Sequence, residues 1–374
     1  MNCEIEFLPV GDGSKPGDAI VIRYGEPDAY ELMIVDGGNI DSGKEIVKHI
    51  HAHFGQNILV SHVVLTHCDA DHASGLREVL RELPVVKLWL HLPWTFAAEA
   101  RPYFANKNWT DKGLEQTLRE EYDIIGELVQ LAVNQATAIE QPFAGAVIGP
   151  FRVLSPYRGA YPLLLPQFDR TPDADEAALQ AANFWIGKPP GVIAALVEKV
   201  AEKLAEKVQA MIPETWETER LKDGGVTSAT NETSVVLYGE CSAGKVLLTG
   251  DAGVWGFAMA QLQAKQMGIS LPGLSFVQIP HHGSRRNIGP TTLNALLGPI
   301  RAQDAPRPCL AFVSAPKDDS THPRRMVLNA FMRRGCEYQA TQGQKKVFWG
   351  GFPPRPGYVA LSPCEFNYEV EDYD

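Results

Sequence analysis

The stretch that decides the fold reads Thr66-His67-Cys68-Asp69-Ala70-Asp71-His72. It directly follows Val63-Val64-Leu65, an apolar run that is typical of a buried strand. Alternate side chains of an extended backbone lie on one side, so we expect His67, Asp69 and Asp71 to face the same way, with His72 where a helix begins. A polar loop with chance acids and histidines is the alternative. The order of four ligands argues against it and predicts a site for two neighbouring divalent cations.

Three later segments place further ligand-type residues where predicted strands end. Asp251 ends Leu247-Leu248-Thr249-Gly250-Asp251, His281 and His282 follow Ile279-Pro280, and His322 precedes Pro323. Each segment is weak alone, because an aspartate in a turn or a histidine before proline is usually structural. Adjacent residues point in opposite directions, so one of the paired histidines is expected to bind metal and the other to support it. The sequence leaves open which one does so.

The order of these motifs resembles the metallo-β-lactamase fold, and specifically the soluble hydrolase domain of the competence protein ComEC family. The resemblance runs from about residue 7 to residue 323 and also includes Val10-Gly11-Asp12-Gly13 with Gly17-Asp18-Ala19, Ile34 to Gly38, and Asn231 to Leu237. There are departures: Ser14-Lys15-Pro16 lengthens the opening loop, and Cys68 stands where the family often has proline. The membrane channel of the full-length competence proteins has no counterpart, so DNA uptake is not implied.

The resemblance implies a metallohydrolase with an α/β sandwich of αββα type. It implies metal ligands at these positions: His67, Asp69, Asp71, His72, Asp251 and His281 or His282. It implies that His322 lies on the substrate side. For a hydrolase with two metals we also expect Asp71 to orient the attacking water. Residues expected to support the metal ligands are Asp36, Asn231, Ser234 and Ser284.

The chain has no histidine between His91 and His281, although many enzymes of this fold take a metal ligand from that interval. The first metal would then be bound by His67, Asp69, Asp251 and water, with Asn231 or Ser234 as a further candidate. This set is rich in carboxylate oxygen, which suits Mn²⁺ or Mg²⁺ as well as Zn²⁺. We therefore predict two divalent metals, one of them weakly held.

The hydrophobic pattern predicts one domain over residues 1–350, interrupted by a largely helical insertion at 96–225, and a tail at 351–374. Segments 112–140 and 192–212 have apolar residues at helical spacing, and the stripe from Ile193 to Met211 is typical of a core helix. The strand predicted at 151–156 stands alone between these helices.

The composition is that of a folded globular protein: 374 residues, 45% hydrophobic and 21% charged, with a formal net charge of −11. No apolar run is long enough for a membrane span, and the first residues are acidic, unlike a signal peptide. Six scattered cysteines without a C-x-x-C pair predict reduced thiols in a cytoplasmic protein.

The acidic total conceals a basic segment, because residues 281–350 hold eleven Lys or Arg and four Asp or Glu, a net charge of +7. Two arginine pairs adjoin the histidine motifs, and planar guanidinium groups suit phosphate recognition. The predicted phosphate contacts are Arg285, Arg286, Arg324 and Arg325. For Arg333-Arg334 and Lys345-Lys346 we expect a solvated helix face and a surface loop.

These features predict a metal-dependent phosphodiesterase or nuclease that acts on nucleic acid or another phosphodiester. A small-molecule hydrolase for a lactone, thioester or cyclic nucleotide is the first alternative, and a regulatory protein with an inactive metal centre is the second. A regulatory protein partner is also expected, since an uncontrolled nuclease would be harmful, and no membrane is involved. Five aromatic residues of the insertion are candidates for base stacking, although core packing is the commoner role: Trp94, Phe96, Tyr103, Phe104 and Trp109.

Overall fold

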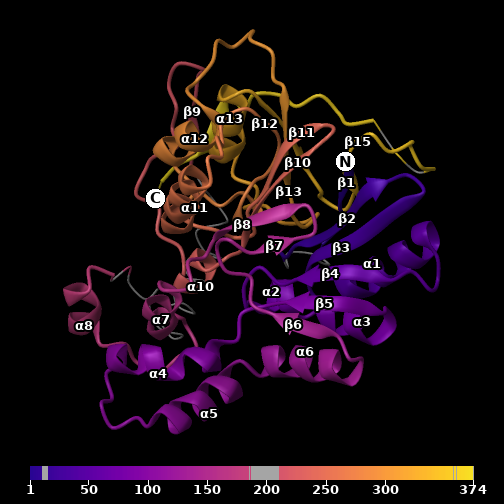
Figure 1. Ribbon diagram of the computed structural model, residues 1–374. Coiled ribbons are helices and arrows are strands. Elements are labelled where there is room, and N and C mark those ends of the chain that lie inside the picture. The colour runs from indigo at the N-terminus through magenta and orange to yellow at the C-terminus, as the bar shows by residue number, and fades with distance from the viewer. Residues whose placement is uncertain (11–15, 185, 187–209, 357, 359, 374) are drawn as a thin grey trace.

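Two seven-stranded sheets pack face to face, and helices cover the outer side of each (Figure 1). The computed structural model describes residues 1–10, 16–184, 186, 210–356, 358 and 360–373. The predicted αββα sandwich is confirmed. The predicted helix at 192–212 lies almost wholly outside the described residues.

The first sheet contains most of the amino-terminal strands, in the order β15-β1-β2-β3-β4-β5-β6. Its strands are β1 (Asn2–Phe7), β2 (Ala19–Glu26), β3 (Ala29–Gly37), β4 (Val60–Val64), β5 (Val85–Trp89), β6 (Ala138–Glu140) and β15 (Lys346–Gly350). From β3 to β6 the strands are parallel. Their carboxyl ends therefore share one edge of the sheet, where ligand-binding loops of α/β proteins usually gather.

The second sheet has the order β14-β13-β12-β11-β10-β8-β7, and its strands β11 to β14 are parallel. The strands are β7 (Val147–Ile148), β8 (Phe151–Ser155), β10 (Val236–Cys241), β11 (Gly244–Leu248), β12 (Leu274–Gln278), β13 (Cys309–Val313) and β14 (Cys336–Ala340). The loops that follow β11, β12 and β13 carry Asp251, the His281-His282 pair and His322. The parallel arrangement thus brings three predicted motifs to one edge.

The helices divide between the two outer faces and the segment between β5 and β10. On the first sheet lie α1 (Ile40–Phe54), α2 (Ala70–Ala73), α3 (Leu76–Glu82) and α6 (Asp123–Asn134), and on the second α11 (Val254–Gln266), α12 (Pro290–Leu297) and α13 (Arg325–Arg333). Among the described residues between β5 and β10, the other helical elements are α4 (Ala97–Ala100), α5 (Asp111–Glu121), α7 (Tyr161–Leu164), α8 (Glu176–Ala181), α10 (Ala229–Glu232) and the 3-10 turns Pro93–Phe96, Arg101–Tyr103 and Leu165–Gln167. The 3-10 turn His281–Gly283 follows β12. Across the described ranges, no helix is both long and apolar enough to cross a membrane.

Alternation along β2 shows how the sandwich is built. Ile20 and Ile22 face the core between the sheets, while Ala19 and Val21 face the core beneath the helices. A strand with apolar residues on both faces is expected where both faces are covered. Burying one such isoleucine side chain contributes roughly 1.5–3 kcal/mol.

Segment 96–225 is less separate from the sandwich than the predicted insertion. Its strand β6 extends the first sheet, and β7 and β8 extend the second. The strand predicted to stand alone at 151–156 is β8, which pairs with both β7 and β10. Its pattern gave no sign of these partners, since one of them lies about eighty residues further on. The domain boundaries themselves remain predictions.

The carboxyl-terminal segment is not a free tail. Strand β16 (Glu369–Glu371) pairs antiparallel with β9 (Met211–Pro213), and Val370 is fully buried beside the second sheet. The buried side chain of Val370 and the short pairing of β16 with β9 hold this end of the chain against α13.

One expectation about exposed side chains is wrong. Arg333 and Arg334 are buried rather than solvated, because Glu214 and Glu219 pair with them. A buried charge needs such a partner. Of the aromatic residues proposed for base stacking, Trp94, Phe96 and Phe104 are buried in the core, as their usual role suggests, and present no face to a ligand.

Candidate metal centre

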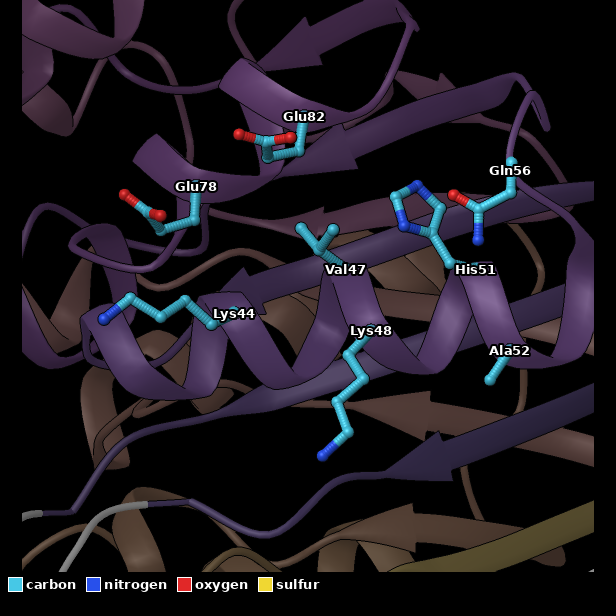
Figure 2. A pocket seen from close by; sticks show the side chains of 8 residues that line it. All are labelled: Lys44, Val47, Lys48, His51, Ala52, Gln56, Glu78 and Glu82. Carbon is cyan, nitrogen blue, oxygen red and sulfur yellow. The ribbon is translucent and has the colours of Figure 1, made fainter.

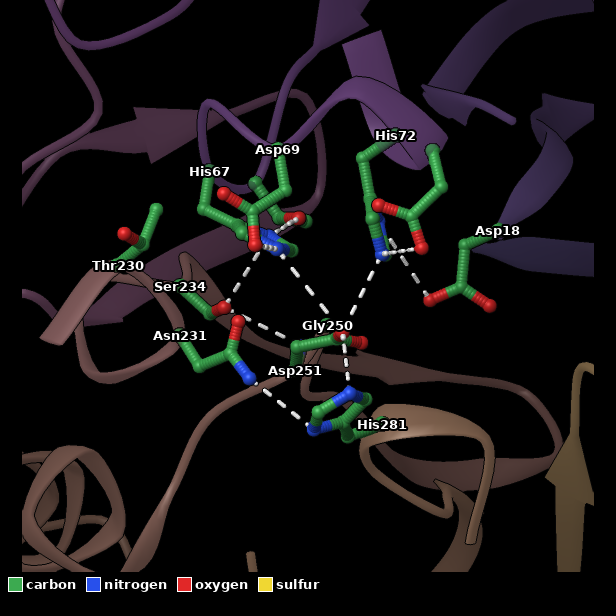
Figure 3. Close-up of polar contacts among 12 residues, drawn as sticks. Asp18, His67, Asp69, His72, Thr230, Asn231, Ser234, Gly250, Asp251 and His281 are labelled. Carbon is green, nitrogen blue, oxygen red and sulfur yellow. Dashed lines mark hydrogen bonds and ion pairs between the residues drawn. The ribbon is translucent and has the colours of Figure 1, made fainter. Parts of the chain in front are cut away.

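One carboxylate oxygen lies at the centre of the predicted site (Figure 3). Asp251 Oδ2 is 3.3 Å from His72 Nε2, 3.7 Å from His281 Nε2, and 3.9 Å from the Nε2 atoms of both His67 and His282. Ligands roughly 2.0–2.1 Å from a shared ion lie about 3.4 Å apart in a tetrahedron. The spacing is therefore that of atoms arranged around cations.

The donor set fits divalent metal because its inner atoms lack any other partner. The Nε2 atoms of His67, His72 and His282 and the Oδ1 atom of Asp251 are buried without a hydrogen bond. Unpaired polar atoms in an interior cost free energy, and natural proteins rarely retain them without a function. A cluster of four such atoms, three imidazole nitrogens and one carboxylate oxygen, matches the ligand chemistry of zinc and manganese.

The outer nitrogen of each imidazole is held by the protein, which leaves Nε2 free for metal. His72 Nδ1 lies 2.7 Å from Asp36 Oδ2, and His282 Nδ1 lies 3.1 Å from the carbonyl oxygen of Ser314. His67 Nδ1 lies 2.9 Å from Thr66 Oγ1 and 3.3 Å from Ser234 Oγ. Such contacts fix the ring orientation and the tautomer of metal-binding histidines.

The paired histidines both reach the centre, unlike neighbours in an extended strand. His281 and His282 have φ angles of +46° and +55°, in the left-handed region. This backbone turns both imidazoles toward Asp251. His282 also lies 3.7 Å from Asp71 Oδ2, whereas His281 Nδ1 contacts Asn287 Oδ1 and Asn231 Nδ2. The ligand atoms of Asp71, His72 and His282 lie within 4.8 Å of one another, and so do those of Asp251, His281 and His282.

Among the remaining candidates Asp69 is exposed, whereas Asn231 and Ser234 are buried. Asp69 Oδ2 is 3.6 Å from His67 Nε2, and its side chain is 43% exposed. Asn231 has a buried Oδ1 atom without a partner, so it can supply an oxygen to the first metal. Ser234 Oγ instead accepts a hydrogen bond from the backbone nitrogen of Asp251. Of the two candidates, Asn231 therefore has the free ligand atom.

Charges within the centre compensate one another. Burial alone would lower the pKa of His72, but the surrounding carboxylates, Asp251 foremost, raise that pKa well above its usual value. For His282 burial also opposes the charge, while Asp251 and Asp71 raise the pKa to about 9. In return, these imidazoles hold the pKa of Asp251 well below its usual value despite its burial. The metal-free centre thus contains protons that cations would displace.

His322 lies in a loop that packs onto the histidine pair. A Cβ atom on Gly283 would come within 2.5 Å of Pro323 Cβ, and the backbone nitrogen of Arg324 donates to the carbonyl oxygen of Gly283. Asp319 organises this loop, accepting from the backbone nitrogens of Thr321 and His322 through Oδ1. Its other oxygen lies 3.2 Å from His322 Nδ1, so the imidazole is oriented.

The predicted phosphate-binding arginines divide into two groups. Arg285 donates from Nη1 to the carbonyl oxygen of Asp372 and lies over the Tyr373 ring, and Arg325 Nη1 approaches the carbonyl oxygen of Glu369. These two arginines therefore contact the carboxyl-terminal segment. Arg286 is exposed and Arg324 is half-buried. Ser284, predicted to support the metal ligands, accepts a hydrogen bond from the backbone nitrogen of Arg286.

Several residues around the centre were missed by the sequence analysis. Asp18, Gln278, Asn287 and Asp319 are buried or half-buried polar residues that contact the ligands or their loops. Asp18 belongs to the quoted Gly17-Asp18-Ala19 motif and offered a signal. The other three stand among ordinary polar residues, and no pattern separates them from surface positions.

A groove of about 550 Å³ lies away from this centre, between α1 and α3 (Figure 2). Its walls carry charges of both signs and a histidine: Lys44, Val47, Lys48, His51, Ala52, Gln56, Glu78 and Glu82. None of these is a predicted site residue.

Comparison with known proteins agrees with this fold. Residues 13–139 match the family model described as Metallo-beta-lactamase superfamily. The matched part includes His67 to His72, so the candidate ligand motif lies in the region that is similar to that superfamily. The finer resemblance to the competence-protein hydrolase domain remains a prediction. No curated protein matches the sequence.

Solved structures show a distant likeness. Zn²⁺-bound PqqB from Methylobacterium extorquens is 11% identical, with a TM-score of 0.37 over 92% of this chain and 99% of that one. MEM-A1, a subclass B3 metallo-beta-lactamase from a soil metagenome library, is 12% identical, with a TM-score of 0.30 over 78% and 85%. The dizinc quorum-quenching lactonase AidC is 10% identical, with a TM-score of 0.28 over 67% of each chain. Likenesses of this size carry no argument about substrate.

Proposed function

We propose that the protein is a hydrolase that uses two divalent cations. The observation that carries the proposal is the convergence of four imidazole Nε2 atoms on Asp251 Oδ2, three of them buried without another partner. Asp71, His72 and His282 would hold one cation, since their ligand atoms lie within 4.8 Å of one another. We assign the other cation to His67, Asp69 and Asp251, with Asn231 or His281 completing its site. Zn²⁺ or Mn²⁺ suits this set, and Mg²⁺ is the third candidate.

Bound cations would supply water of lowered pKa and neutralise charge that develops on a leaving oxygen. The protein's own residues then have separate tasks. Asp71 is 35% exposed at its side chain and can accept a hydrogen bond from a water molecule at the mouth of the centre. His322, oriented by Asp319, can donate a proton to a leaving group from the substrate side.

A phosphodiester, in a nucleic acid or a smaller molecule, is the substrate class we favour. The segment that carries the histidine pair and His322 has a net charge of +7 within an otherwise acidic chain, and its charge near the centre is smaller, because Arg333 and Arg334 are paired with Glu214 and Glu219. Positive charge around a metal centre concentrates anionic substrates. Arg286 and Arg324 lie next to the residues that contact the centre and are the arginines we assign to the phosphate.

A small neutral or weakly anionic ester, such as a lactone or thioester, is the second candidate. The observation in its favour is that Arg285 and Arg325 are already engaged by the carboxyl-terminal segment. These contacts make Arg285 and Arg325 less available to a substrate than the sequence implies. Hydrolysis of a neutral ester would depend little on salt, whereas binding of a polyanion weakens steeply with salt.

Metal analysis and substrate assays together test the proposal. Purified protein should contain up to two divalent ions, of which one is removed by mild chelation because its site includes the exposed carboxylate of Asp69. Single-stranded and double-stranded DNA and RNA, a generic diester and a lactone should be assayed with Zn²⁺, Mn²⁺ and Mg²⁺ in parallel. Asp251→Asn should lose metal and reduce hydrolysis by at least about a hundredfold.

Outcomes separate the two substrate classes. Cleavage of a diester that disappears with Asp251→Asn supports the phosphodiesterase. Cleavage of the lactone alone would replace it with the small-molecule hydrolase. A protein that holds metal but cleaves no substrate with any ion would instead favour a binding role. Two zinc ions that resist mild chelation would refute the weakly held site.

A further inference from the structure

Gln278 is a buried residue whose side-chain amide both donates and accepts hydrogen bonds. It is the last residue of β12 and is 1% exposed. Its Nε2 atom donates to Asp18 Oδ2 at 2.8 Å, and its Oε1 atom accepts from the backbone nitrogens of Thr249 at 2.9 Å and Gly250 at 3.1 Å. A buried amide costs free energy unless it is hydrogen-bonded, so three bonds to fixed partners hold this side chain in one orientation.

The partners of Gln278 belong to the two halves of the metal centre. Thr249 and Gly250 directly precede Asp251 in the loop after β11 of the second sheet. Asp18 directly precedes β2 of the first sheet, and its Oδ2 atom lies 3.9 Å from His72 Nδ1 (Figure 3). Gly17 brings this segment close, since a Cβ atom there would meet the carbonyl oxygen of Asp71 at 2.4 Å. One side chain therefore joins the loop of Asp251 to the surroundings of His72.

We propose that Gln278 is a positioning residue that sets the separation of ligands from the two sheets, and thereby the affinity for metal. The proposal rests on the metal centre of the proposed function. Asp251 Oδ2 and His72 Nε2 are 3.3 Å apart, the shortest approach between the carboxylate and an imidazole of the centre. The amide of Gln278 holds the loop of Asp251 so that this carboxylate stays at that distance from His72 Nε2. Supporting residues of this kind typically change metal affinity by about 10–100-fold.

Gln278→Met tests the proposal because methionine has nearly the same shape and makes none of these hydrogen bonds. Zn²⁺ and Mn²⁺ are added separately to metal-stripped protein, and binding is followed by calorimetry or by competition with a chromophoric chelator, well below the unfolding temperature of every variant. Affinity for at least one of the two ions should fall by about 10–100-fold. Activity is not needed for this readout.

Gln167→Met is the matched control. Gln167 is likewise fully buried and makes three hydrogen bonds, donating to the carbonyl oxygens of Leu163 and Phe184 and accepting from the backbone nitrogen of Ile186. It lies in the helical segment after β8 and touches no metal ligand through these bonds. Its substitution should lower thermal stability to a similar degree and leave metal affinity unchanged.

A pair of substitutions tests the link to Asp18 directly. Gln278→Glu keeps an acceptor for Thr249 and Gly250 but turns a carboxylate toward Asp18, so metal affinity should fall. Adding Asp18→Asn reverses the hydrogen bond and conserves the total charge. The double variant should regain wild-type affinity to within about threefold, although each substitution alone perturbs the pair.

Three results would overturn the proposal. Gln278→Met could bind metal as tightly as the wild type, which would show that Gln278 is only structural. The Gln167 and Gln278 variants could lose affinity equally, which would show that general destabilisation is responsible. Finally, wild-type protein that binds neither ion would remove the metal centre itself. The first two results leave metal binding by the wild-type protein intact. Failure of the proposal about Gln278 can therefore be distinguished from failure of the proposed function.

Discussion

Asp36 Oδ2 lies 2.7 Å from His72 Nδ1, on the side of the imidazole opposite to the Nε2 atom that faces Asp251. Asp36 also accepts from the backbone nitrogen and the hydroxyl of Thr66, each at 2.7 Å. Its φ of +58° is unusual for a residue other than glycine, and these three contacts hold it there. The end of β3 thus orients ligands that follow β4, before any metal binds.

Asp36→Asn should weaken metal binding while the fold is kept. The asparagine oxygen can still accept from Thr66, but its NH₂ group would meet the N–H of His72 and misalign the ring. We expect metal affinity to fall about 10–100-fold. The free energy of unfolding should be about 1–3 kcal/mol lower than in the wild type, because one buried donor loses its acceptor. Metal titration and thermal unfolding measure the two effects.

Asp41→Asn serves as the control for this change, because Asp41 is an exposed aspartate that pairs with Lys44 at the surface of α1. It should behave as the wild type in both measurements. If Asp36→Asn also kept wild-type metal affinity, the contact between Asp36 and His72 would have no bearing on the centre.

Much of this centre could be predicted from the sequence because its ligands directly follow predicted strands. Carboxyl ends of parallel strands meet at one edge, so His67, Asp251 and His282 had to approach one another once both sheets formed. The left-handed turn at His281 was not predictable, since no glycine or asparagine at that position announces it. Gln278 was not predictable either, because its partner Asp18 is 260 residues away.

Charged residues in the sequence predicted their own surroundings less reliably than did the positions of residues that follow predicted strands. The arginine pair on α13 resembles a solvated face, yet Arg333 makes a buried ion pair with Glu214, 119 residues earlier in the chain. A local pattern cannot show a partner that only the fold supplies. For the same reason Arg285 could be assigned to phosphate on sequence, whereas in the structure it contacts Asp372.

Stability of the metal-free protein should depend on pH through His282. Its pKa in the fold is about 9, above the ordinary value of 6.5, because Asp251 and Asp71 outweigh its burial. A histidine whose pKa is raised by folding stabilises the fold fully at pH values below its pKa in the unfolded chain. This contribution is lost as the pH rises through its pKa in the folded protein. Chelator-treated protein should therefore lose up to about 3 kcal/mol between pH 6.5 and 9. Denaturant unfolding at a series of pH values measures it.

Metal should reverse this trend, because cations displace the same protons and bind more tightly as pH rises. With saturating Zn²⁺ the loss between pH 6.5 and 9 should disappear. His282→Gln should also flatten the profile of the metal-free protein. A metal-free wild type whose stability is constant or rises across this window would contradict the assigned charge of the centre.

His322→Gln should reduce hydrolysis without removing metal. The imidazole is oriented by Asp319 in a loop against Gly283, and general acid catalysis contributes about 10²–10⁴-fold. Asp319→Asn keeps the acceptor for the two backbone nitrogens but removes the charged partner of Nδ1, and we expect a smaller loss, about tenfold. Turnover and bound metal are measured on the same samples. Loss of metal in His322→Gln would make His322 a ligand instead.

Removal of the last three residues should alter binding of a phosphodiester through Arg285. This guanidinium donates to the carbonyl oxygen of Asp372 at 2.6 Å and lies 4.6 Å from the centre of the Tyr373 ring. A chain that ends at Glu371 keeps β16 and the buried Val370 but frees Arg285 from both contacts. A hydrogen bond from a freed guanidinium to phosphate is expected to lower KM for the diester by up to about tenfold. KM for a neutral ester should not change.

Arg285→Ala in the shortened chain is the control that identifies the group responsible. It should return KM for the diester to that of the full chain, whereas Arg285→Ala in the full chain should have little effect, since the guanidinium is already engaged there. The gain should also shrink at high salt, because exposed charges are screened over about 10 Å at 0.1 M ionic strength. If shortening the chain changed KM for the neutral ester equally, the carboxyl-terminal residues would act by obstructing access, and Arg285 would have no part in recognising phosphate.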